Sequence, residues 1–328
     1  MDNKDLMKVD LTTPSISSTY AGEYAGKYIS AALLENTTIS RELISVNQNI
    51  KYKWVVNKGV LSGIIADGTC DFTDAGVITT TERILEPITL QVNLQLCKAD
   101  FRSDWEAVSM GYSAYDSMPP IFTDWLTAQI LGQVAQQIET TIWMGNAATA
   151  GEFGGFVELM TADGDVIDVA GASIGAGGVT AANVLVELGK VETAIPKAVY
   201  GKQGCMIAVA DNVFRAYVSA LAGYQAGGIG ASGTDTKGNQ WFAGDPNTPL
   251  YFNGIPVQRV EGLDANYMVA YEKENLWFGT GVLNDSNELR IVDTSEILGD
   301  QNVRFIARWT SGVQYGLGAE CVLYTPVA

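Results

Sequence analysis

A long amphipathic helix is the feature that most constrains the fold of this chain. Its start is marked by Pro119 and Pro120, because proline suits the first turn of a helix. Apolar residues then recur at every fourth position, and the pattern ends at Gly145. We therefore predict a helix over 118–144, about 37 Å long. Its apolar stripe consists of Leu126, Ile130, Val134, Ile138 and Ile142.

A rod of this length needs a sheet to cover its apolar face. We expect the first four residues of the stripe to form the core of the helix face. The sheet that covers them is predicted to include Phe305 and Trp309, which stand in a late run of β-branched and aromatic residues.

The segment before the helix has the pattern of strands. Residues 49–100 contain two runs rich in β-branched residues, separated by the polar, glycine-containing stretch ADGTCDFTDAG at 66–76. This pattern predicts one long two-stranded excursion. Because an isolated hairpin is marginal in water, we expect it to lie on another surface.

The N-terminal segment, 1–48, is predicted to be an extended arm. Its first part is polar and has no sustained apolar period. Residues 19–35 have a helical pattern, in which Tyr20, Tyr24 and Tyr28 recur at every fourth position. Two glycines weaken this helix, so we expect it to need the surface of a neighbouring subunit.

The C-terminal half alternates helices and strands and then becomes rich in strands. A helix is predicted over 180–195, a buried strand over 205–210, and a second helix with Asp211 as its N-cap. After a glycine-rich loop at 225–248, strands continue to the end of the chain. With 35 glycines against nine prolines, the whole sequence predicts an α+β protein.

The charge is strongly acidic and unevenly placed. The net charge is −17, and no Lys or Arg occurs between Arg102 and Lys190. This argues against a surface that grips nucleic-acid phosphates, although DNA that is merely enclosed stays compatible with it. We expect Lys51, Lys53 and Lys58 to approach the acidic surface of a neighbouring subunit, with the apolar Trp54 supplying stronger anchoring at the same contact.

Two motifs with catalytic associations stand in the wrong context. The run Gly171 to Gly175 matches the nucleophile elbow of hydrolases, but the chain contains no histidine to act as the base. The run Gly228 to Gly233 matches a dinucleotide fingerprint, but it follows a predicted helix instead of a strand. We predict no catalytic residues and no cofactor site.

Metal binding is not predicted either. Asp163, Asp165 and Asp168 lack the spacing of a calcium loop and are interpreted as a solvated acidic turn. Zinc would need histidine or paired cysteines. The four cysteines are far apart and are predicted to be buried free thiols; they are Cys70, Cys97, Cys205 and Cys321. The charged N-terminus and the lack of a long apolar run predict a protein that is soluble and cytosolic when made.

The order of these segments resembles the major capsid proteins of tailed bacteriophages, the Hong Kong 97-type fold, which herpesvirus capsid floors and encapsulins share. The C-terminal strands that carry this resemblance are NGIPV at 253–257, NLWFGTG at 275–281 and NVRFIARWTSGVQYG at 302–316. The resemblance implies the following division: an N-terminal arm over 1–48, an extended loop over 49–100, a peripheral domain over 101–179 with the spine helix, an axial domain over 180–299, and return strands of the peripheral domain over 300–328.

The resemblance implies a structural protein and not an enzyme. Such a chain self-assembles through hexamers and pentamers into an icosahedral shell that encloses phage double-stranded DNA. Its further partners would be portal, scaffolding and decoration proteins, with assembly in the host cytoplasm and no membrane. Two alternatives stay open at this point. An encapsulin-like compartment would share the fold and need a cargo protein, and a hydrolase would need a catalytic set that the sequence does not display.

Overall fold

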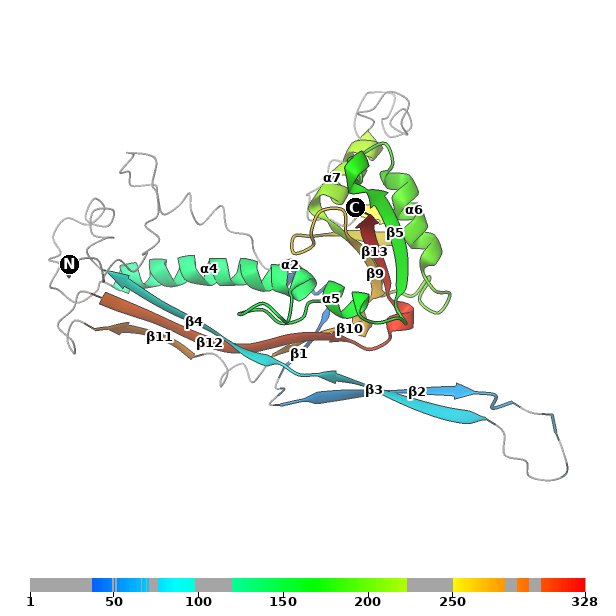
Figure 1. Ribbon diagram of the computed structural model, residues 1–328, viewed down its shortest axis with the longest axis horizontal. Coiled ribbons are helices and arrows are strands. Elements are labelled where there is room, and N and C mark those ends of the chain that lie inside the picture. Colours follow the sequence, from blue (N-terminus) through cyan, green and yellow to red (C-terminus); the bar gives the residue numbers. More distant parts are fainter. Residues whose placement is uncertain are drawn as a thin grey trace, which may run out of the picture.

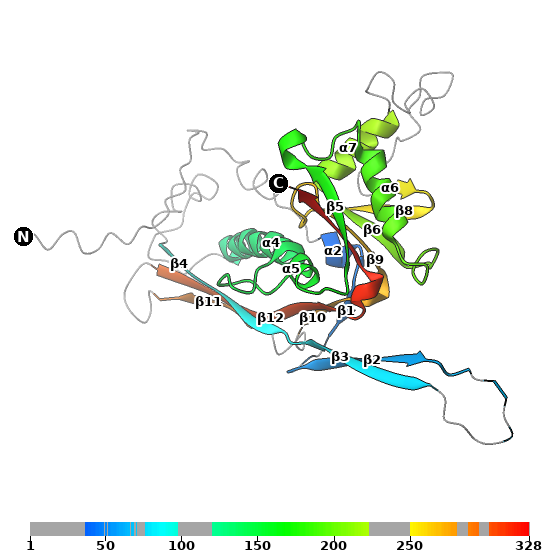
Figure 2. The same cartoon turned by 45° about the vertical axis from the view of Figure 1, so that its right-hand side comes forward.

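The protein is elongated, with two sheets side by side and a hairpin that reaches away from both (Figures 1 and 2). The computed structural model describes residues 37–48, 50, 52–65, 67–68, 70, 76–97, 120–222, 250–280, 288–294 and 302–327. The predicted helix over 19–35, with its three tyrosines, lies outside the described residues, and so does Lys51.

The first sheet is built around β12 (Asn302–Tyr315). Along one edge β12 pairs antiparallel with β4 (Ile88–Cys97). Along its other edge it pairs antiparallel with β10 (Leu276–Thr280) and β11 (Glu288–Asp293). The short β1 (Ser45–Asn47) extends the sheet by pairing parallel with β10.

The long helix α4 (Pro120–Met144) lies along this sheet, as Figure 1 shows. It begins at the second proline of the predicted start. It ends at Gly145, where the amide nitrogen bonds the Thr141 carbonyl oxygen at 3.0 Å. A Cβ atom at position 145 would lie 2.3 Å from the Phe153 carbonyl oxygen, so only glycine lets the chain turn this closely.

The second sheet has six strands in the order β5, β13, β9, β6, β8, β7. Their bounds are β5 (Ile167–Ser173), β13 (Val322–Val327), β9 (Met268–Glu272), β6 (Cys205–Ala210), β8 (Ile255–Val260) and β7 (Leu250–Phe252). Two helices pack against each other and on this sheet: α6 (Val184–Ala194) and α7 (Asp211–Ala222). None of the described helices is both long and apolar enough to cross a membrane.

The remaining helical elements are short. They are α2 (Thr37–Ser40), α5 (Phe156–Thr161) and three 3-10 turns, η1 (Ile174–Ala176), η3 (Lys273–Asn275) and η4 (Gly318–Glu320). Both sheets and α5 share one core. In it the fully buried Trp143, at the end of α4, lies with its ring centroid 5.4 Å from that of Phe156 and 5.9 Å from that of Tyr271.

The two sheets do not follow the predicted segment boundaries. β5 lies in the segment predicted as peripheral (101–179), and β13 lies in the predicted return segment (300–328), yet both belong to the second sheet. Conversely, β10 and β11 fall within the predicted axial segment (180–299) but belong to the first sheet. The reason is that a strand's own pattern shows which residues are buried, whereas its sheet is decided by partners far away in the chain.

The predicted excursion over 49–100 also divides. β2 (Trp54–Ser62) and β3 (Val77–Leu85) form an antiparallel hairpin, but β4 leaves it after Glu86 and Pro87 and joins β12. Pro87 has no N–H group to continue the ladder of the hairpin. The prediction of one two-stranded unit is therefore wrong for 88–97. In the described part of the chain, the strands of the hairpin pair only with each other.

Candidate functional site

The face of α4 toward the first sheet contains the predicted spine residues that the structure describes. Ile130, only 9% exposed, forms a small apolar cluster with Phe305 and Ala307 of β12, and Val134 and Trp309 pack against it. Further along the helix, Ile138 packs against the main core. The side chain of Leu126 lies outside the described part of the structure.

A buried carboxylate on the same helix holds the chain segment that enters the first sheet. Glu139 is 1% exposed and accepts a hydrogen bond from the Thr38 amide at 3.1 Å, and another from the Thr38 hydroxyl. The Trp143 ring nitrogen donates to the same hydroxyl at 2.8 Å. These bonds satisfy polar groups that would otherwise be costly to bury, so they fix α2 on α4.

The regions with catalytic associations contain no paired nucleophile and base among the described residues. Ser173 ends β5 and is followed by the 3-10 turn η1 instead of the α-helix that a nucleophile elbow needs. The run 228–233 lies outside the described residues. Within the described ranges, no group of three or more His, Cys, Asp or Glu side chains is placed to hold a metal ion.

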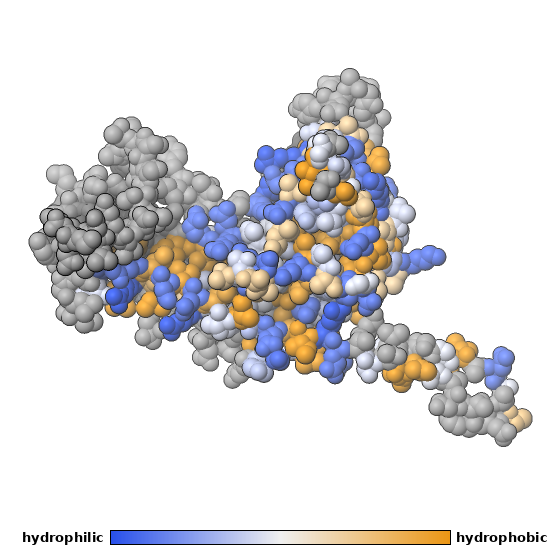
Figure 3. Space-filling model, viewed as in Figure 1, coloured by the Kyte–Doolittle hydropathy of each residue, from blue (hydrophilic) through white to orange (hydrophobic). Residues whose placement is uncertain are grey.

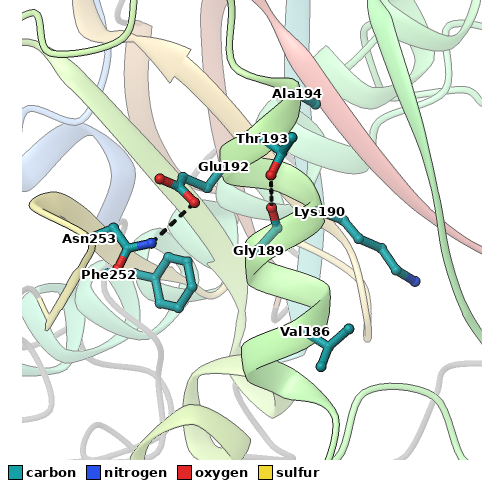
Figure 4. A pocket seen from close by; sticks show the side chains of 8 residues that line it. All are labelled: Val186, Gly189, Lys190, Glu192, Thr193, Ala194, Phe252 and Asn253. Carbon is teal, nitrogen blue, oxygen red and sulfur yellow. Dashed lines mark hydrogen bonds between the residues drawn. The ribbon is translucent and has the colours of Figure 1, made fainter.

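A shallow hollow of about 620 Å³ lies between α6 and the turn after β7 (Figure 4). Its carboxylate, Glu192, accepts hydrogen bonds from Asn253 at 3.1 Å and from the Tyr200 hydroxyl at 3.0 Å. Its hydroxyl, on Thr193, donates to the Gly189 carbonyl oxygen at 2.7 Å. The ammonium of Lys190, which also lines the hollow, pairs with Glu187 at 2.7 Å. The polar groups of the hollow therefore already have partners within the chain, and their arrangement does not favour a particular reaction.

The β2–β3 hairpin exposes apolar side chains, which form orange patches along it in Figure 3. Val55 and Ile84 face each other across the two strands and are 45% and 44% exposed. Ile78 lies on the same face and is 69% exposed. Apolar surface on an uncovered two-stranded ribbon is typical of a site that binds another protein surface.

Two of the predicted contact residues lie at the base of this hairpin. Trp54 packs edge-on against Trp277 of β10, with ring centroids 5.0 Å apart, so it anchors β2 to its own chain. Lys53 forms an ion pair with Glu86 at 2.9 Å, and the hydrogen bond to this carboxylate raises the pKa of the lysine. Lys58 lies within β2, but its side chain is outside the described part.

The base of the hairpin also contains a cluster of three residues that the sequence did not indicate. We call Arg83, Asp163 and Tyr315 the hairpin clamp. Asp163 Oδ2 accepts hydrogen bonds from the Arg83 guanidinium and from the Tyr315 hydroxyl, the latter at 2.7 Å. The carbon atom of the guanidinium lies 5.0 Å from the centre of the Tyr315 ring, a cation–π distance.

The clamp changes the interpretation of the acidic turn. Asp165 and Asp168 are exposed, as predicted, but Asp163 is partly buried. This burial by itself would raise the pKa of Asp163. Hydrogen bonds from Tyr315, the Asp165 amide and Arg83 outweigh it and hold that pKa below its usual range. No local signal could have shown this, because both partners of the carboxylate lie far away in the chain.

The cysteines are free, as predicted, but they differ in exposure. Cys205 and Cys321 are buried, Cys97 is half-buried and Cys70 is exposed. The prediction of burial is therefore wrong for Cys70. Cys70 lies in the sequence between β2 and β3, and no described part of the chain buries it.

Comparison with known proteins identifies the fold. No protein-family model and no curated protein matches the sequence. Solved structures do match it over most of its length. The capsid of Myoviridae phage XM1 is similar with a TM-score of 0.58 and 10% identity, over 89% of this chain and 92% of that one. The capsid of cyanophage P-SCSP1u gives 0.57 and 12%, over 95% and 93%.

The capsid of an empty GTA particle is similar with a TM-score of 0.56 and 15% identity, over 90% of this chain and 92% of that one. In each case the match covers most of the chain and is not confined to one motif. This chain therefore has the fold of the major capsid proteins of tailed bacteriophages, as the order of its segments predicts.

Proposed function

We propose that this chain is a major capsid protein, which self-assembles into an icosahedral shell around the double-stranded DNA of a tailed phage. The observation that carries the proposal is the extent of the shared fold, which covers 89% to 95% of this chain in the three comparisons. The chains that it matches build capsids, so assembly into a shell is the function that this fold supports best.

We infer that the hairpin binds a neighbouring copy of the chain. Burial of apolar surface stabilises an interface by about 25 cal/mol per Å². The exposed face of Val55, Ile78 and Ile84 provides such surface at a point that the described part of its own chain leaves uncovered. In a ring or shell of identical copies, each hairpin can meet the same region of the next copy. The three tyrosines of the N-terminal arm stay predicted contacts of the same kind.

The lysines near the hairpin would add charge complementarity to this contact. We infer that Lys51, Lys53 and Lys58 approach the acidic stretch of the neighbour between Arg102 and Lys190. Lys53 already pairs with Glu86, but both side chains are well exposed, 38% and 50%. Solvent screens an exposed pair and leaves it only weakly stabilising, so exchanging Glu86 for a carboxylate of the neighbour costs little.

The proposal extends to the partners and to the chemistry of the chain. We infer hexamers and pentamers of this chain, completed by portal, scaffolding and decoration proteins and assembled in the host cytoplasm. We further infer that the chain is not an enzyme. A shell-building fold and a sequence without histidine support this, because a Ser-His-Asp mechanism would have no base.

The test is electron microscopy of the purified protein, with Ile78→Asp and Ile78→Val as a matched pair. We expect closed shells from the parent and from Ile78→Val, which keeps the apolar contact. We expect folded but unassembled subunits from Ile78→Asp, because a carboxylate would have to be buried at the interface. Particles formed during infection should protect DNA from nuclease. A parent protein that forms no shells, or shells filled with a protein cargo in place of DNA, would contradict the proposal.

A further inference from the structure

We propose that the hairpin clamp sets the angle at which the β2–β3 hairpin leaves the body, and therefore the place where the hairpin meets a neighbouring copy. The role of the clamp in holding the hairpin rests on the structure of the single chain. Its consequence for the neighbour rests on the proposed function.

The half of the clamp that belongs to the body is held in place without the hairpin. Asp163 Oδ1 accepts a hydrogen bond from the Asp165 amide at 3.1 Å, and Tyr315 donates to Oδ2. The Tyr315 hydroxyl also lies 3.2 Å from the carbonyl oxygen of Leu159, within α5. The carboxylate is thus oriented by the body, and Arg83 is the one group of the clamp that the hairpin contributes.

The backbone next to the clamp leaves room for this carboxylate. A Cβ atom at position 318 would lie 2.7 Å from Asp163 Oδ2 and 3.2 Å from the Cβ of Asp165. Because residue 318 is glycine, the Asp163 carboxylate can lie against the backbone of η4 and reach Tyr315 at the end of β12. The body thus presents an oriented carboxylate to the Arg83 guanidinium at the base of the hairpin.

The other contacts at the hairpin base leave its angle open to adjustment. Leu85 is 1% exposed and marks where β3 enters the body, and Trp54 packs on Trp277 beside it. Gln314 donates to the Ile84 carbonyl oxygen at 3.1 Å. All of these lie in the last two residue pairs of the hairpin, so they act like the axis of a hinge. Arg83 contacts the body one step farther out and opposes rotation about that axis.

The length of the hairpin amplifies any rotation at its base. Each strand has nine residues, which at about 3.3 Å per residue makes a lever of roughly 30 Å. A rotation of about 10° would displace its far end by roughly 5 Å, which is about one strand spacing. A contact as small as one guanidinium on one carboxylate can therefore decide which surface of the neighbour the hairpin reaches.

The test measures the hairpin angle in the unassembled subunit, isolated by size-exclusion chromatography. Spin labels are placed at T80C on β3 and T140C on α4, both exposed, after Cys70 and Cys97 are changed to serine. The width of the electron-electron distance distribution reports the range of angles. We expect Arg83→Gln to broaden it at least twofold. Glu82→Gln, the matched control, removes an exposed charge from the neighbouring residue and should leave the width unchanged.

Asp163→Asn is the second variant and should broaden the distribution as Arg83→Gln does, since it weakens the same contact from the other side. Equal widths for Arg83→Gln, Asp163→Asn and Glu82→Gln would overturn the clamp. Should one clamp variant fail to fold by circular dichroism, the other decides. The result is separable from the proposed function: a parent that forms no shells refutes that function, whereas the widths in the single subunit still decide the clamp.

Discussion

The turn after β8 lies tightly against the long helix at Gly262, and replacing this glycine by alanine tests how the second sheet and the helix pack. The glycine follows β8 and lies against the backbone of α4. A Cβ atom at position 262 would lie 2.1 Å from the Glu139 carbonyl oxygen, 2.7 Å from its carbonyl carbon and 2.9 Å from the Trp143 ring. These atoms belong to Glu139 and Trp143 near the end of α4, whose side chains are buried and bonded to Thr38.

The cost follows from these distances. Non-bonded heavy atoms approach without repulsion to roughly 3.5 Å, so the loop and the helix would have to separate by about 1 Å or more. Overpacking of this kind costs about 1 to 3 kcal/mol where side chains can yield. Here the obstacle is helical backbone, so we expect Gly262→Ala to lower the free energy of unfolding by about 3 kcal/mol.

The matched control is Gly189→Ala, in the middle of α6. A Cβ atom there would meet nothing within 4 Å, so the change should stabilise the protein by about 0.5 to 1 kcal/mol through helix propensity. The assay is urea unfolding of the unassembled subunit, followed by tryptophan fluorescence, since the buried Trp143 lies at the contact. A Gly262→Ala variant as stable as Gly189→Ala would refute this packing of the sheet on the helix.

Two further predictions concern burial. Ile130→Asp places a charge in the apolar cluster between α4 and β12, so it should lower the free energy of unfolding by several kcal/mol. The control Ile65→Asp, at a position that is 96% exposed, should change the urea midpoint little. Equal midpoints for the two variants would show that Ile130 does not face the sheet. Burial raises the pKa of the Cys321 thiol to about 12, so this thiol stays protonated at pH 8 and should resist iodoacetamide until the protein unfolds. The exposed Cys70 should react first. Mass spectrometry of the labelled peptides checks the order of reaction.

Local periodicity was enough to predict the three longest helices that the structure describes, α4, α6 and α7, but not the short α2 and α5. The prediction of 118–144 agrees with α4 to within two residues at its start, and the predicted helix at 180–195 contains α6. The strand at 205–210 and the helix that begins at Asp211 are confirmed as β6 and α7. These elements carry their signals within themselves, because apolar spacing, prolines and glycines act on residues a few positions away.

The sequence by itself determined the order of the segments, and through that order the resemblance to a capsid fold. Only the tertiary structure decided that β4 leaves the hairpin for β12 and that β5 and β13 join the second sheet. It also decided that Asp163, which looks like part of a solvated turn, holds Arg83 from 80 positions away. The physical reason is the same in each case: strand partners and ion pairs are chosen by the packing of the whole chain, and a residue's own neighbours in the sequence carry no record of that choice.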